Sequence, residues 1–165
     1  MTKNSMSEFS PGTAALTLRK ATVQDAELLF NWANEDVVRS NSIHSKKIIW
    51  ADHLNWLDLK LSSSNFLLIL EVERVPAGQI RFDFDPQENG WVIDYSISPD
   101  HRGKGLGKTI VAMGMAYVKK FPVIAYVKLN NGPSIKVFES LQFRRENIYT
   151  KNGNDVIKFI KIESS

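Results

Sequence analysis

Residues 98–108 read SPDHRGKGLGK and join a predicted strand to a predicted helix. Pro99 turns the chain after the strand, and Gly103, Gly105 and Gly107 precede the first turns of the helix. Glycine has no Cβ, so the backbone N–H groups of such a loop can point toward one ligand without steric interference. The start of the helix adds partial positive charge at the same place. The segment therefore predicts a loop that binds phosphate or pyrophosphate.

Basic side chains gather in and beside this loop, at His101, Arg102, Lys104 and Lys108. The whole chain of 165 residues has 21 Lys and Arg against 18 Asp and Glu, a formal net charge of +3. This charge is mild, and no long basic stretch is typical of a nucleic-acid-binding arm. A local basic cluster in such a chain predicts a small anionic ligand rather than a nucleic acid.

Three phosphate-loop patterns compete for the segment. A dinucleotide fingerprint needs G-x-G-x-x-G, whereas Gly103, Gly105 and Gly107 give G-x-G-x-G. A P-loop needs G-x-x-x-x-G-K-[ST]; residues 107–109 supply its end, but Arg102 stands where its first glycine would fall. The pattern R-x-x-G-x-G fits Arg102, Gly105 and Gly107 without a gap. A glycine-rich turn without a ligand is the plain alternative.

The periodicity of apolar residues around the loop predicts a mixed α+β fold. The predicted strands are 16–19, 66–72, 78–85, 90–98, 122–128, 143–150 and 156–162, and the predicted helices are 23–37, 50–61, 105–120 and 133–141. Thr22 and Asp25 have the spacing of a capping box, and the polar stretch 39–45 predicts a loop. Antiparallel hairpins in the middle of this order exclude a simple doubly wound parallel sheet.

The composition predicts one domain over residues 16–165. Residues 1–15 are small and polar and are expected to form a disordered tail, without the apolar core of a signal peptide. The absence of cysteine excludes disulfides and thiolate catalysis and favours a cytoplasmic location. We expect no membrane span, because no apolar run approaches roughly 18 residues. We also expect no metal site, because no spacing of His, Asp and Glu matches a ligand motif.

A second motif lies downstream of the loop. Asn131-Gly132-Pro133-Ser134 and the following 138–143 segment resemble N-x-x-[AS]-x-x-x-Y-x-K-x-G-F. Together with R-x-x-G-x-G after a strand, this segment resembles the GNAT superfamily of acyl-CoA-dependent N-acetyltransferases, over roughly residues 16–162. The resemblance implies the GNAT fold, in which a mostly antiparallel central sheet splits between its fourth and fifth strands and carries helices on both faces.

The resemblance also implies acetyl-CoA as cosubstrate. The loop N–H groups would hold the pyrophosphate, and the strand end around Ile97 would pair with the pantetheine through its main chain. The implied cofactor-binding residues are Ile97, Arg102, Gly103, Lys104, Gly105, Leu106, Gly107, Lys108, Asn131 and Ser134. Arg102, Lys104 and Lys108 would add mobile cations. A helix N-cap is the compatible alternative for Asn131.

The chain departs from the family at the usual proton donor, because Phe138 stands where many members have tyrosine. The proton donor could instead be another hydroxyl group or a water molecule. Alternatively, CoA could leave as a thiolate and need no proton donor. Arg81, Asp83 and Asp94 lie on central strands that normally bury apolar residues, so they predict a cleft lining. Asp94 is the first candidate for the catalytic base or amine anchor and Asp83 the second. A structural ion pair with Arg81 is the alternative. A histidine could also take the amine proton, but a structural or surface role is the expectation for His44 and His53.

A further resemblance concerns the acceptor amine. Segments 31–35, 38–42, 53–57 and 78–83 resemble a GNAT subgroup that acetylates nucleotide-linked amino sugars, such as sialic-acid-like precursors. It implies that Trp32 and Trp56 stack on a sugar or base, with core packing as the alternative. It implies that Arg39 and Arg81 meet a substrate phosphate.

Other acceptors and other classes stay open. A protein N-terminus, a lysine or an antibiotic could be the acceptor, and a non-catalytic CoA sensor or a P-loop phosphotransferase would be a different class of protein. A small-molecule amine is the expected partner, without nucleic acid or membrane, and the expected assembly is a monomer or a homodimer.

Overall fold

The structure, a computed structural model, describes residues 14–165. Residues 1–13, most of the expected tail, lie outside the described part. One seven-stranded sheet has the order β1-β2-β3-β4-β5-β7-β6. The strands are β1 (Leu16–Lys20), β2 (Phe66–Val72), β3 (Val75–Asp85), β4 (Gly90–Ile97), β5 (Val123–Lys128), β6 (Arg144–Lys151) and β7 (Asn154–Lys161). The helices are α1 (Ala26–Ala33), α2 (Asp36–Asn41), α3 (Trp50–Ser62), α4 (Leu106–Val118) and α5 (Gly132–Ser140), with 3-10 turns η1 (Val23–Asp25) and η2 (Pro99–His101).

The sheet divides between its fourth and fifth strands. β4 and β5 run parallel and pair through two residue positions, Trp91 with Val123 and Val92 with Ile124. The other neighbouring strands pair antiparallel. Beyond Val92, β4 has no pairing with β5, so the two strands separate toward the C-terminal end of β4. The expected α+β fold with a split sheet is confirmed.

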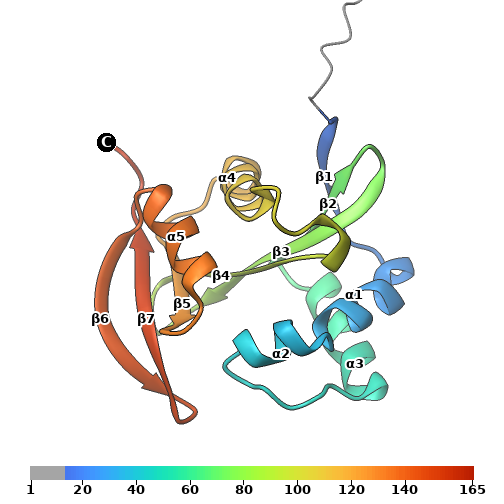
Figure 1. The fold of residues 1–165 in the computed structure, drawn as a ribbon, viewed down its shortest axis with the longest axis horizontal. Helices are drawn as coiled ribbons and strands as arrows, with labels where there is room; N and C mark the ends of the chain where they lie inside the picture. Colours follow the sequence, from blue (N-terminus) through green and yellow to red (C-terminus); the bar gives the residue numbers. More distant parts are fainter. Residues whose placement is uncertain (1–13) are drawn as a thin grey trace, which may run out of the picture.

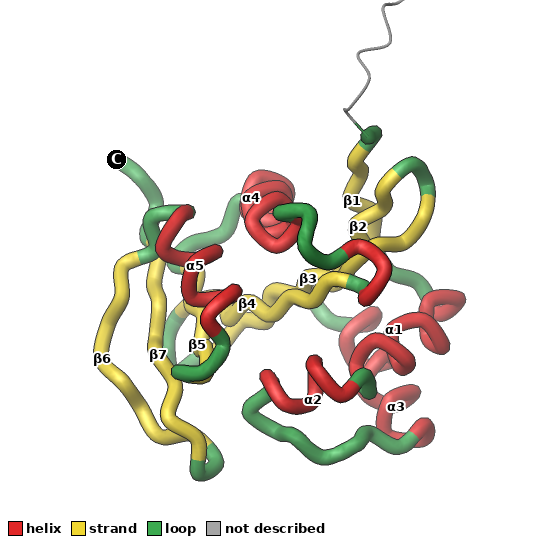
Figure 2. The backbone as a smooth tube through the Cα atoms, in the orientation of Figure 1, coloured by secondary structure: helices red, strands yellow, loops and turns green. Residues whose placement is uncertain are grey.

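Helices cover both faces of this sheet (Figure 1; Figure 2). α4 and α5 lie on one face, over the main core, which includes Ile80, Phe82 and Ile110 without any solvent exposure. α1 and α3 lie on the opposite face over a second, smaller core that includes Trp32 and Ile69. Trp32 therefore packs in the core, which is the alternative that the sequence offered to stacking on a substrate.

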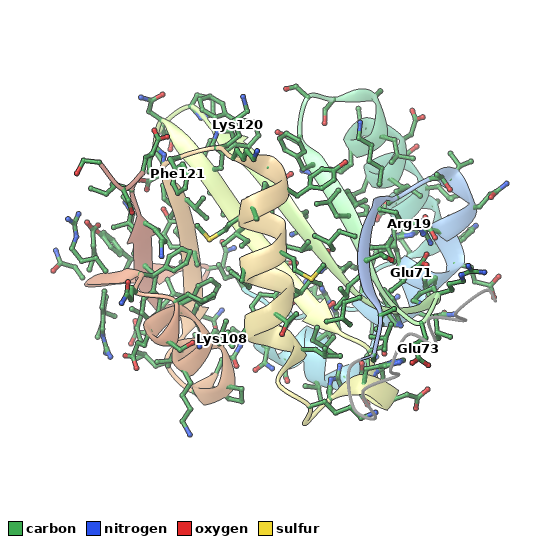
Figure 3. The ribbon with its side chains drawn as sticks, turned by 90° about the horizontal axis from the view of Figure 1, so that it is seen from above. Arg19, Glu71, Glu73, Lys108, Lys120 and Phe121 are labelled. Atoms are coloured by element: carbon green, nitrogen blue, oxygen red, sulfur yellow. The ribbon has the colours of Figure 1, made fainter. Side chains whose placement is uncertain are left out.

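The predicted capping box forms at the start of the first helical segment. The Asp25 carboxylate accepts the Thr22 N–H at 2.8 Å, and the Thr22 hydroxyl accepts the Gln24 N–H at 3.3 Å. Both Asp25 oxygens also accept Arg19 guanidinium donors at 2.8 Å. Arg19 bonds Glu71 as well, across the β1–β2 pair, where both labels lie in Figure 3. The cap thus ties the helix start to the sheet edge.

The first predicted helix, 23–37, is wrong as one element, and so is the predicted loop 39–45 at its start. The chain forms η1, α1 and α2 instead, and Arg39–Asn41 is helical. Asn34 ends α1 because its side chain exchanges two hydrogen bonds with the backbone of Ile48, at 2.8 and 2.7 Å. These partners are 14 positions apart, so a local pattern does not reveal the break.

Within residues 14–165, no helix combines the length and the apolarity that crossing a bilayer requires.

We expect Asp25→Asn to lower the free energy of unfolding at pH 7 by about 1–3 kcal/mol, because Arg19 and the cap lose a charged acceptor in a buried position. Hydrogen bonds from Arg19 hold the pKa of the Asp25 carboxyl below its ordinary value of 3.8. Stability linked to Asp25 is therefore complete above that unfolded-state value and is lost as pH falls through the folded-state value.

Urea unfolding at pH 7 and pH 3 measures this effect. The gap between wild type and Asp25→Asn should narrow at pH 3, and an equal gap at both pH values would contradict the assignment. The control Asp36→Asn removes an exposed pair with Lys47 and should leave the unfolding midpoint close to wild type.

Candidate active site

A cleft of about 530 Å³ lies where β4 and β5 separate. Its walls come from α2, the second half of β4, the loop before α4, the middle of β5, and α5. It brings together most of the predicted cofactor residues: Ile97, Arg102, Gly103, Gly105, Leu106, Gly107, Lys108, Asn131 and Ser134. Lys104 is not among the lining residues. In Figure 3, Lys108 lies at the start of α4, beside α5.

The loop has the backbone that an anion-binding turn needs. Gly103 and Gly105 both have φ of +75°, a conformation that side chains with a Cβ adopt only under strain. A Cβ at either position would meet no atom within 4 Å, so the space next to the loop is open. Gly105 is the N-cap of α4, whose first N–H groups have no partner within the helix. The loop therefore fits a pyrophosphate group.

Gly107 serves a different purpose from the other two glycines. A Cβ there would lie 3.3 Å from the Val137 side chain and 3.4 Å from the Tyr95 ring. The absent side chain lets α4 approach α5 and β4 closely, and this approach forms the inner wall of the cleft.

The Arg102 side chain is not a mobile cation, and that expectation is wrong. Its guanidinium bonds both carboxylate oxygens of Glu35, with Nη2 2.6 Å from Oε2, and its Nε donates to the Ile97 carbonyl at 3.1 Å. The Ile97 carbonyl keeps one lone pair for a second donor. Lys104 and Lys108 make no ion pair with any residue of 14–165 and keep their charge available.

α5 brings a cap and a hydroxyl to the cleft. The Asn131 side chain accepts the Ser134 N–H at 3.3 Å, so the expected N-cap forms. The Ser134 hydroxyl lies 2.9 Å from the Tyr95 hydroxyl, which comes from β4. Burial raises the pKa of Tyr95, which keeps its hydroxyl protonated. Phe138 is 3% exposed and packs against Phe143, so it offers the cleft no polar atom.

Sequence reasoning missed the Tyr95 hydroxyl. The alternation of β4 could have revealed it, because Ile93, Tyr95 and Ile97 share the face that carries α4 and α5.

The predicted polar face of β3 and β4 is present, on the side of α1 and α3. Arg81 pairs in register with Asp94, and Gln79 pairs with Ser96. The Asp94 side chain is half exposed and lines the cleft, and its Oδ2 accepts Gln79 Nε2 at 3.1 Å. Asp94 therefore meets the geometric requirement for contact with an acceptor.

Asp83 does not line the cleft. Its carboxylate bonds Lys60 Nζ at 2.6 Å and lies 3.2 Å from Arg81 Nε. Asp83 therefore fits the alternative interpretation, a structural ion pair, better than it fits a catalytic role.

The two predicted phosphate-binding arginines differ in their surroundings. Arg81 lies over the Trp56 ring, 5.5 Å from its centroid, and its buried Nε lies 3.2 Å from Asp83 Oδ2, an ion pair without hydrogen-bond geometry. Arg39 instead donates to Ala33 O at 2.5 Å and His44 O at 2.8 Å, and burial lowers its pKa. Arg39 therefore holds the segment after α2 in place, whereas Arg81 pairs with Asp83 and Asp94. Neither arginine is among the residues that line the cleft.

The histidines are structural, as expected. His53 is 2% exposed, lies 2.7 Å from the Ala26 carbonyl and stacks on Trp56. His44 contacts Asn152 at the β6–β7 turn. No group of three or more His, Cys, Asp or Glu within residues 14–165 is arranged to hold a metal ion.

Comparison with known families agrees with this geometry. The family model described as "Acetyltransferase (GNAT) domain" matches residues 15–144, which is most of the chain. The chain belongs to the GNAT acetyltransferase family. It is therefore an acetyl-CoA-dependent N-acetyltransferase, and a P-loop phosphotransferase is excluded.

Relatives and solved structures extend the comparison. The uncharacterized N-acetyltransferase p20 of Bacillus licheniformis is 29% identical to this GNAT chain over 147 residues, covering 82% of this chain and 83% of p20. Spermidine N-acetyltransferase from Vibrio cholerae, solved with CoA and spermine, superposes with a TM-score of 0.79 at 17% identity, over 89% and 95% of the two chains. An aminoglycoside acetyltransferase solved with coenzyme A gives 0.74 at 18% identity, over 90% and 95%. The two structures share the GNAT fold.

We expect acetyl-CoA to raise the melting temperature of the wild-type protein by mass action. Gly105→Asp should abolish this rise, because it places a carboxylate where the pyrophosphate would lie. Differential scanning fluorimetry with and without acetyl-CoA measures both effects.

Gly105→Asn is the matched control. Asn has nearly the same shape as Asp and tolerates positive φ, but carries no charge. It should keep much of the rise, and an unchanged acetyl-CoA effect in Gly105→Asp would overturn the assignment of the loop.

Proposed function

We propose that this GNAT enzyme acetylates the primary amine of a small molecule that also carries an anionic group, such as a nucleotide-linked amino sugar. The observation that carries this proposal is Arg81. Its guanidinium lies over the Trp56 ring and beside two carboxylates, with Nη1 3.6 Å from Asp94 Oδ2 and Nε 3.2 Å from Asp83 Oδ2. Of these residues only Asp94 lines the cleft, and Arg81 and Trp56 lie behind it on the same face of the sheet. We propose that this aromatic ring, cation and carboxylate suit a sugar or base, a phosphate and an amine, respectively.

The loop residues would bind and orient the cosubstrate. Bound acetyl-CoA supplies the acetyl group as an activated thioester. The N–H groups of residues 103–108 would hold its pyrophosphate, and Lys104 and Lys108 would balance the phosphate charge. These residues are predicted contacts, supported by the left-handed glycines and by the open space next to them.

Asp94 would receive the amine. Gln79 donates to Asp94 Oδ2, which also faces Arg81, whereas Asp94 Oδ1 takes part in neither contact. Oδ1 would hold the ammonium group of the acceptor and take a proton from it, directly or through a water molecule, so that a neutral amine attacks. Asp83, paired with Lys60, would set the charge of the same face.

The walls of the cleft favour a small acceptor over a protein terminus. Lys128 Nζ on β5 bonds the Ser40 carbonyl in α2 at 2.8 Å. The Asn154 side chain on β7 bonds the Ile43 carbonyl at 3.3 Å. These bonds connect the end of α2 to strands beyond the split, whereas a peptide acceptor would need an open groove.

A polycationic amine is the second candidate. Spermidine and aminoglycoside acetyltransferases are among the structural neighbours. The carboxylates of Asp83 and Asp94 on the acceptor face would suit such an acceptor. Arg81 would repel a polycationic acceptor, whereas it would attract an anionic one. Substitution of Arg81 therefore distinguishes the two candidates.

Asp94→Asn should lower turnover by roughly 10²–10⁴-fold, the range that general bases contribute, while the Kd of acetyl-CoA stays near wild type. Steady-state CoA release and titration calorimetry measure the two quantities. Asp83→Asn, the same change on the same face, should lower turnover much less. If Asp94→Asn turned over at the wild-type rate at every pH, Asp94 would not be the group that takes the proton from the amine.

Arg81→Gln should raise the KM for an anionic acceptor by roughly tenfold or more, since a charged hydrogen-bonding partner is lost. The comparison uses an amino sugar linked to a nucleoside diphosphate and the same amino sugar without the nucleotide. The KM of the free amino sugar should change little. If Arg81→Gln improves spermidine turnover and leaves the nucleotide conjugate unaffected, the polycationic acceptor is correct instead.

A further inference from the structure

An ion pair connects the cofactor loop to the wall of α2. Glu35 lies directly before α2, and Arg102 lies directly before the glycines of the loop. Both Arg102 terminal nitrogens bond the two carboxylate oxygens of Glu35. The two residues are 67 positions apart in the sequence, so the pair joins two segments that are close only in the folded chain.

The geometry makes this pair more constrained than an ordinary surface ion pair. The side chains of Arg102 and Glu35 are 33% and 24% exposed, so solvent screens their charges only partly. The guanidinium is held at a third point by Ile97 O. A bidentate, three-point arrangement fixes orientation as well as distance.

Each end of the pair lies next to a different part of the cleft. Arg102 precedes Gly103 and Gly105, whose φ of +75° sets the shape of the loop. Glu35 begins α2, whose Val37, Val38 and Asn41 line the cleft. The pair is therefore a direct contact between the loop and the α2 wall of the cleft.

We propose that Glu35 is a positioning residue that couples the cofactor loop to α2, so that CoA at the loop orders the acceptor-side wall. The inference rests on the proposed binding of CoA at the loop. Because coupling is reciprocal, loss of the pair also weakens CoA binding. Glu35 itself is not among the residues that line the cleft, so it would act through Arg102.

Hydrogen–deuterium exchange with and without CoA tests the coupling, in wild type and in Glu35→Gln. In wild type, saturating CoA is expected to slow exchange of the loop amides 103–108 and of the α2 amides 36–41. In Glu35→Gln, saturating CoA should still protect the loop, but it should no longer protect α2. Calorimetry should show a Kd for CoA roughly five- to thirtyfold higher in the variant.

Asp36→Asn is the matched control, because it removes an adjacent ion pair of α2, with Lys47, that does not reach the loop. It should retain CoA-dependent protection of α2. A double-mutant cycle with Arg102→Gln adds a second readout. The double variant should bind CoA no more weakly than the worse single variant, because either change removes the same interaction.

Two results would overturn the inference. CoA-dependent protection of α2 that persists in Glu35→Gln would show that α2 responds without the pair. Additive losses in the cycle would show that Glu35 and Arg102 act separately. A wild-type protein that does not bind CoA would instead refute the proposed function, and this inference with it.

Discussion

The separation of β4 from β5 is the constraint on which the rest of the site depends. Two residue pairs hold the strands together at one end, and beyond them the main chain of β4 loses its neighbour. Unpaired backbone groups in a sheet are costly unless another partner satisfies them. The split therefore creates both the space and the unsatisfied polar groups that an extended ligand can use. The glycine loop and α5 meet at this same opening.

Packing on the two sides of the sheet explains why the opening persists. α4 reaches the inner wall through Gly107, and the fully buried Phe82 and Ile110 hold it against the strands. On the other face, the apolar surface of β2 gives way to polar residues on β3 and β4, where Arg81 and Asp94 meet. The sheet thus presents an apolar surface to α4 and α5 and a partly polar surface to α1 and α3.

Local chemistry explains what the sequence could predict. The loop, the order of the strands along the chain, the capping box at Thr22 and the N-cap at Asn131 follow from residue types at short spacing, and the structure contains all of them. The glycine loop on this side of the cleft was predictable because three glycines and a helix start lie within one short segment, and Gly103 and Gly105 indeed have positive φ.

Contacts between distant segments explain what the sequence could not predict. The break before α2 depends on Asn34 bonding Ile48, and the side chain of Arg102 is diverted by Glu35. The pairing of Asp83 with Lys60, which separates it from Asp94, also spans two elements. Hydrophobic periodicity does not reveal partners in distant elements, so these contacts could be found only in the folded structure.

The most direct test is the release of the CoA thiol over time, corrected for hydrolysis, from acetyl-CoA and a panel of amines. The panel contains amino sugars, their nucleoside diphosphate conjugates, polyamines, aminoglycosides and peptides. We predict that release depends on the amine and is fastest with the nucleotide conjugates. Release that no amine accelerates above hydrolysis, or that is fastest with a peptide, would contradict the proposed acceptor chemistry.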